Sequence, residues 1–187
     1  MRYRSLDAAR GVAILLMIAD HFLGVWLSLD GPSWLMIIRN TVTRPSLALF
    51  MVVSGILLAK RGLMSGTRLL EVTAAGALVT VGFFFLGFGL PDVLVVYVLT
   101  VPLWGALMRW PLVVGSLGLL QAVNLPIAWG GYQPGYVLVW LAIGVVAARL
   151  GTIPEFRWKA LEVCGRRPLA LYVGHVFVLV VCVGVVA

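Results

Sequence analysis

Residues 5–24 read SLDAARGVAILLMIADHFLG, a largely apolar run with ionisable side chains towards both ends. About 20 apolar residues are what one helix needs to cross the hydrocarbon core of a bilayer. Backbone polar groups must be paired within such a segment, so a helix is expected. Asp20 and His21 then lie inside the membrane, where a charged group costs about 2.5 kcal/mol or more and ionisable residues are usually functional. The stretch therefore predicts a membrane span that carries a candidate site.

The rest of the chain has the same apolar character. Of 187 residues, 62% are apolar and 11% are charged, against about 45–50% and about 25% in soluble domains. This composition excludes a large soluble catalytic domain. It predicts an all-α polytopic bundle in the lipid bilayer, a multi-pass protein of the cell membrane, with residues 1–187 as a single domain. Apolar runs fall at 8–29, 43–60, 68–89, 92–108, 111–128, 134–150 and 168–187, which gives about seven spans.

The charges predict how these spans are oriented. The net charge is +7, from 14 Lys and Arg against 7 Asp and Glu. With a cytoplasmic N-terminus and seven spans, all the cations except Arg39 and Arg44 lie inside, as the positive-inside rule requires. The charge therefore indicates sidedness and not a nucleic-acid partner. Cys164 and Cys182 lack the spacing of a metal site or a disulfide framework, so no metal is expected.

One face of the first helix connects its two ends. At about 100° per residue, Arg10 and His21 differ by only about 20° in direction, and they lie about 16 Å apart along the axis. Asp20 points about 100° away from His21, so it does not support that ring directly. The alternative is that His21 is a hydrogen-bonded packing residue and that Arg10 is a cytoplasmic anchor paired with Asp7 three residues earlier.

Two later segments contribute further candidates. Ser54 in the second span could let a helix or a ligand approach closely, although helix packing is the commoner explanation for such a residue. Before that span, Arg39 and Arg44 are either binding groups for an anionic acceptor or solvated loop residues.

The polar connector 151–167 is expected to hold an interfacial helix around residues 156–163, and Arg166 and Arg167 follow it. These two arginines could contact a phosphate or serve as positive-inside anchors. In the last span Tyr172 and His175 are three residues apart and share a helix face.

Three blocks together resemble the transmembrane acyltransferase superfamily, which includes acyltransferase family 3 and the heparan-alpha-glucosaminide N-acetyltransferase-like proteins. They are RSLDAARGVA at residues 4–13 leading to Met17 and His21, LFMVVSG at 49–55, and GRRPLALYVGH at 165–175. The blocks cover about a quarter of the chain. Family members usually have ten or more spans, so this chain resembles an unusually short member, and a homodimer could complete its site.

The resemblance implies an enzyme that transfers an acyl group, with acetyl as the expected one, from cytoplasmic acyl-CoA to a hydroxyl or amine of a sugar-type acceptor. Arg10 and His21 match the Arg and His that acyltransferase family 3 requires in its first helix. We expect His21 to act as the general base and Arg10 to orient the CoA phosphates or a polar network. Asp20 would tune a neighbouring group, and Tyr172 and His175 would line the same cavity.

Three other functions stay open. His21 and His175 could be the axial ligands of a haem b, although counting from the starts of their spans puts the rings at about 15 Å and about 10 Å from the inner boundary. Asp20 and His21 could serve a proton-coupled transporter, although no internal repeat supports that function. The chain could also be a catalytically inactive relative of the acyltransferases.

Overall fold

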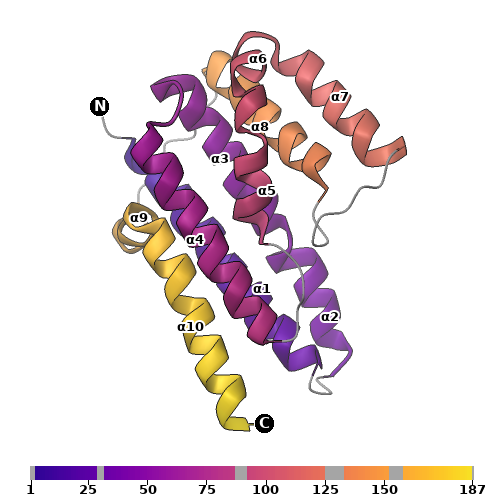
Figure 1. The fold of residues 1–187 in the computed structure, drawn as a ribbon, viewed down its shortest axis with the longest axis vertical. Coiled ribbons are helices and arrows are strands. Elements are labelled where there is room, and N and C mark those ends of the chain that lie inside the picture. The colour runs from indigo at the N-terminus through magenta and orange to yellow at the C-terminus, as the bar shows by residue number, and fades with distance from the viewer. Residues whose placement is uncertain (1–2, 29–31, 87–91, 125–132, 152–157, 187) are drawn as a thin grey trace. The chain divides into compact units, whose positions relative to one another are not determined.

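The structure is a computed structural model that describes residues 3–28, 32–86, 92–124, 133–151 and 158–186. Within these ranges the chain is helical and contains no strand, which confirms the all-α prediction (Figure 1). The elements in chain order are α1 Arg4–Ser28, α2 Trp34–Ile38, η1 Arg39–Thr43, α3 Pro45–Arg61, α4 Gly66–Phe85, α5 Val93–Leu99, η2 Val101–Leu103, α6 Trp104–Arg109, α7 Pro111–Asn124, α8 Pro134–Arg149, α9 Lys159–Arg166 and α10 Pro168–Val186.

Each of the seven predicted apolar runs contains a helix, but the helices differ in length. Three described helices are long and apolar enough to cross a membrane, namely Arg4–Leu27, Trp34–Arg61 and Gly66–Phe85. The pair α9 and α10, bent by 83°, gives a fourth if it is counted as one span. The predicted ends of the runs 8–29, 68–89 and 111–128 fall outside the described residues. Several apolar helices are therefore present, while the count of seven and the cytoplasmic N-terminus stay predictions.

The second span begins earlier than its apolar run. Residues 34–42, which lie before the predicted run 43–60, continue α3 backwards as α2 and most of the π-helical turn η1. The wider turn is defined by the backbone N–H of Arg44, which donates to the carbonyl of Arg39 at 3.0 Å. Pro45 follows, and in a regular helix its ring would clash with the carbonyl four residues earlier. The π turn just before the proline accommodates that ring and places Arg39 on a helix rather than in a loop.

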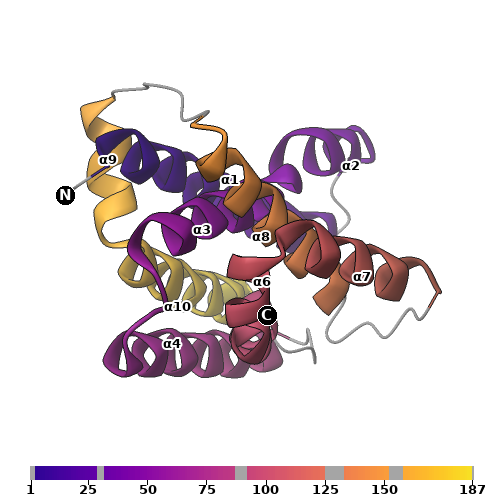
Figure 2. The same ribbon diagram turned by 90° about the horizontal axis from the view of Figure 1, so that it is seen from above.

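The chain divides into two compact units, the first with residues 1–50 and 154–175 and the second with residues 51–153 and 176–187. In the first unit α9 lies across the N-terminal part of α1 (Figure 2). A methyl group on Gly11 would meet the carbonyl of Leu161, and one on Gly165 would meet the carbonyl of Asp7. These two glycines therefore let the backbones touch. The helix expected at 156–163 begins at Lys159 instead, and residues 152–157 lie outside the described part.

The second unit is held by glycines in the same way. A methyl group on Gly55 of α3 would meet the carbonyl of Leu141, and one on Gly144 of α8 would meet the carbonyl of Val52. Between α7 and α8, Gly118 and Gly135 lie against each other's backbone. Small residues at such contacts are typical of helices that associate in a membrane.

Candidate active site

The most direct contact between distant parts of the first unit joins the two histidines of the chain. His21 comes from the C-terminal half of α1, and His175 from the second turn of α10. The Nδ1 atom of His21 lies 2.7 Å from the Nε2 atom of His175, which is hydrogen-bond distance. The ring planes differ by 15° and the ring centroids are 5.0 Å apart. One ring nitrogen donates and the other accepts, so the two histidines form a single hydrogen-bonded pair.

The ring of Tyr172 packs beside this histidine pair. It lies one helical turn before His175 on α10 and is buried. Its ring centroid is 5.1 Å from that of His175 and 6.2 Å from that of His21. The three rings therefore pack together, with the two imidazoles in hydrogen-bond contact and the phenol ring at their side.

His175 lies on α10, directly after the bend between α9 and α10. α9 ends at Arg166, α10 starts at Pro168, and their axes differ by 83° (Figure 1). Proline suits the first turn of a helix because its missing N–H would have no helical partner there. Depth counted from the span starts placed the two imidazoles about 5 Å apart along the membrane normal. The structure instead brings the two rings into hydrogen-bond contact.

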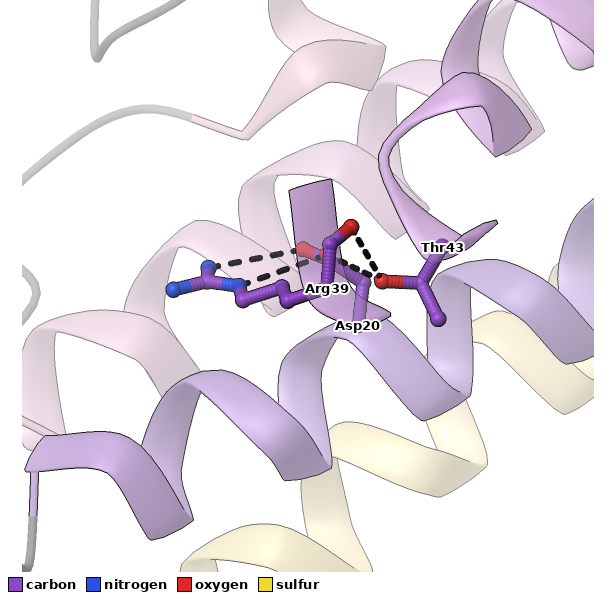
Figure 3. Close-up of polar contacts among 3 residues, drawn as sticks. All are labelled: Asp20, Arg39 and Thr43. Atoms are coloured by element: carbon purple, nitrogen blue, oxygen red, sulfur yellow. Dashed lines mark hydrogen bonds and ion pairs between the residues drawn. The ribbon is translucent and has the colours of Figure 1, made fainter. Parts of the chain in front are cut away.

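The residue before His21 belongs to a second polar cluster, which contains Asp20, Arg39 and Thr43 (Figure 3). Arg39 donates from Nε to Asp20 Oδ1 at 3.3 Å and from Nη2 to Asp20 Oδ2 at 3.4 Å. The Thr43 hydroxyl lies 2.7 Å from Asp20 Oδ1 and 2.9 Å from the carbonyl of Arg39. The side chains of Arg39 and Asp20 are 24% and 15% exposed. The carboxylate predicted to lie in the membrane is therefore paired with a cation.

Gly24 makes the two-pronged contact between Arg39 and Asp20 possible. It lies one turn after Asp20 on α1, and a methyl group on it would come within 2.9 Å of Arg39 Nη2. The guanidinium therefore lies flat against the bare helix backbone. A two-pronged arginine contact of this kind fixes direction as well as distance.

Thr43 is the member of this cluster that sequence reasoning did not single out. It is 3% exposed and lies four residues after Arg39 in the π-helical turn. The available signal was its spacing from Arg39, since residues four apart share a helix face. That signal required residues 39–43 to be helical, whereas the predicted span began only at residue 43.

The other predicted site residues lie elsewhere. Asp7 and Arg10 are on α1 where it meets α9, and Asp7 is buried while Arg10 is half-buried. Arg166 and Arg167 are exposed beside the α9–α10 bend, and Arg166 lies 3.7 Å from Glu162 one turn before it.

Arg44 and Ser54 complete the set. Arg44 is exposed at the end of the π turn. Ser54 is buried in α3 and belongs to the second unit. The structure thus groups His21, Tyr172 and His175, and separately Asp20 and Arg39.

The geometry of the histidine pair bears on the haem alternative. Axial ligands of one haem flank the iron, and at about 2.0 Å per metal–nitrogen bond their ligating atoms are about 4 Å apart. The nitrogens of His21 and His175 that face each other are 2.7 Å apart. This is a hydrogen bond, and it leaves no room for an iron between them. Among the described residues no group of three or more His, Cys, Asp or Glu side chains could hold a metal ion.

Several apolar helices and two polar clusters among their buried faces are typical of a polytopic membrane protein with a site inside the bundle. The family model described as "Heparan-alpha-glucosaminide N-acetyltransferase, catalytic" matches residues 2–144, which is more than half of the chain. The chain therefore belongs to this family, and the resemblance read from the sequence is confirmed. No curated protein and no solved structure matches the chain.

Membership places the chain in a membrane-embedded transferase family that in general uses acetyl-CoA as donor and acts on sugar-type acceptors. The matched residues include α1 with His21, the Asp20 cluster and Ser54. They do not include α9 or α10, and hence not Tyr172 or His175. The family comparison therefore says nothing about the partner of His21.

Proposed function

We propose that this chain is itself an acetyltransferase, which moves the acetyl group of acetyl-CoA to a hydroxyl or amine of a sugar-type acceptor with His21 as general base. The observation that carries the proposal is the hydrogen bond from His21 to a second imidazole inside the first unit. A histidine held in one orientation by a partner on its other nitrogen is arranged for proton transfer. Membership in the acetyltransferase family supports this reaction class.

In this reaction the acceptor oxygen or nitrogen attacks the thioester carbonyl carbon, and the bond from that carbon to sulfur breaks. His21 takes the proton of the acceptor as the new bond forms and later gives it to the leaving CoA thiolate. Imidazole suits both steps because it gains and loses a proton near neutral pH. General acid–base catalysis of this kind contributes about 10²- to 10⁴-fold in rate.

The arginines have proposed roles at two places. Arg10, Arg166 and Arg167 are proposed to bind the phosphates of the donor, because guanidinium groups bind phosphate through paired N–H donors. Arg39 and Arg44 are proposed to bind an anionic group of the acceptor. Arg39 would bind the acceptor and Asp20 at the same time, because two of its N–H groups already donate to the Asp20 carboxylate.

The experiment measures transfer of label from [¹⁴C]acetyl-CoA to glucosamine, an amino sugar with both nucleophiles, by purified protein in liposomes. Wild type is expected to transfer label and to release CoA in equal amount. His21→Ala is expected to lower the rate by about 100-fold or more.

The matched control is Phe22→Ala, which shortens the exposed neighbour of His21 on the same helix. We expect it to keep the wild-type rate. Equal turnover by His21→Ala and wild type would remove His21 from the mechanism. Wild-type protein that releases no CoA and labels no sugar would contradict acetyl transfer itself.

A further inference from the structure

We propose that His175 is the proton-relay partner of His21, so that the two imidazoles work as a dyad and not as one base with a packing neighbour. The inference rests on the proposed function for its chemistry. Its structural basis, a hydrogen bond between two rings 154 residues apart in the chain, stands independently of that function.

The two atoms in contact show which ring nitrogen of each histidine forms the hydrogen bond. The contact joins Nδ1 of His21 to Nε2 of His175, so the second nitrogen of His21, Nε2, is not used in this contact. In a neutral imidazole one nitrogen carries hydrogen and the other is an acceptor. When His21 donates from Nδ1, its Nε2 is therefore the basic nitrogen. The relay uses this tautomer, in which Nε2 of His175 accepts from Nδ1 of His21 and Nε2 of His21 can take a proton from an acceptor.

His175 lies in buried surroundings. Its side chain is 6% exposed, and the buried ring of Tyr172 lies beside it. Buried polar groups are expected to be hydrogen-bonded, and removing one partner leaves the other with an uncompensated cost. His21 therefore provides the hydrogen-bond partner of His175 Nε2. Because His175 is buried, bulk water does not replace His21 as that partner.

The proton balance of the relay is simple. As the acceptor attacks the thioester, its proton moves to Nε2 of His21, and the proton on Nδ1 of His21 moves to Nε2 of His175. The positive charge then rests on His175, two nitrogens further from the acceptor. When the CoA thiolate leaves, both transfers reverse and the sulfur receives the proton, so the two rings return to their starting state.

The first test is spectroscopic and needs no activity. The chain contains only two histidines, so protein labelled with ¹⁵N in histidine shows four ring nitrogens. We expect a through-hydrogen-bond coupling between one nitrogen of each ring, and a strongly downfield proton between them. Both signals should vanish in His175→Gln. Two uncoupled rings in wild type would overturn the dyad.

The second test is kinetic. His175→Gln keeps a hydrogen-bonding side chain that cannot carry the extra proton, and we expect kcat to fall by about 10- to 100-fold with KM unchanged. Added imidazole should restore part of the lost rate to His175→Ala by occupying the vacated space. Leu171→Ala, which truncates an exposed neighbour on α10, is the matched control and should keep its rate.

The outcomes separate the two proposals. Coupled rings in a protein without acetyl transfer would overturn the proposed function and with it the relay, while leaving the hydrogen-bonded pair itself in place. Full kcat in His175→Gln, with transfer still lost in His21→Ala, would overturn the relay and leave His21 as the base. A raised KM with unchanged kcat would make His175 a substrate-binding residue and would also overturn the relay.

Discussion

In the second unit glycines bring helices into backbone contact, and in the first unit ionisable side chains of different helices meet one another as well. Gly55 and Gly144 bring α3 and α8 into backbone contact, and Gly118 and Gly135 do the same for α7 and α8. A buried carboxylate of the second unit, Asp92, accepts from the backbone N–H of Leu94 and caps α5. The backbone N–H of Asp92 also donates to the Thr80 hydroxyl of α4, at 2.9 Å.

The first unit adds a second kind of contact. It too uses glycine, since Gly11 and Gly165 let α1 and α9 touch. Further along α1, however, the contacts are His21 to His175 and Asp20 to Arg39. In lipid there is no hydrophobic drive between helices, so close packing and hydrogen bonds hold them together. The comparison teaches that close glycine contacts are common to both units, and that the ionisable side chains paired between α1 and other helices of the first unit are groups capable of chemistry.

The largest expected effect breaks the packing of the second unit. Gly144→Leu forces a side chain into the carbonyl of Val52, and we expect it to lower the free energy of unfolding by about 3 kcal/mol or more. For a chain of this size that is a fall in Tm of about 6 to 12 °C. Circular dichroism of protein in detergent measures it. Gly105→Leu, where no atom lies within 4 Å, is the control. Equal Tm values for the two variants would contradict the close contact of α3 with α8.

A smaller effect is expected from the ion pair of the first unit. Arg39→Gln leaves the Asp20 carboxylate without its cation, and breaking a buried pair is destabilising because the remaining charge is uncompensated. Since both side chains are partly exposed, we expect a loss of about 2 kcal/mol. A double-mutant cycle with Asp20→Asn isolates the coupling of the pair. Strictly additive effects would show that the two residues act independently and would remove this part of the contrast between the units.

The smallest effect concerns a single hydroxyl. Thr43→Val keeps the shape of the side chain but removes the group 2.7 Å from Asp20 Oδ1, and we expect a loss of about 1 kcal/mol. Thr43→Ser retains the hydroxyl and should lose less. Thermal unfolding in detergent compares the two variants. A greater loss in the serine variant would mean that Thr43 contributes through its methyl group, as packing does in the second unit.

Much of the fold followed from the apolar runs, because a membrane segment must pair its own backbone groups and therefore becomes a helix. The predicted helix boundaries were wrong at two places where local composition did not indicate the structure. Residues 34–42 precede the predicted run 43–60 and were not expected to be part of a span, yet they are helical as far as the π turn before Pro45. The run 92–108 is interrupted by a 3-10 turn at Val101–Leu103, which contains a proline.

The site was predictable residue by residue but not in its contacts. Helical spacing correctly put Asp20 in a direction different from His21, and three-residue spacing suited Tyr172 and His175 to one face. The partners of these groups were out of reach. Depth counting placed the two histidines at different levels, whereas the structure brings their rings into hydrogen-bond contact.

The sequence by itself determined the helical membrane class, the family and the identity of the ionisable residues placed within its apolar runs, because those properties depend on composition, short spacing and local motifs. Only the tertiary structure decided which of these residues meet. His21 finds His175 across 154 residues of chain, and Asp20 finds Arg39 and Thr43 on a π turn. Such meetings depend on how helices cross and bend, and that is set by glycine contacts and proline positions acting together rather than by any one segment.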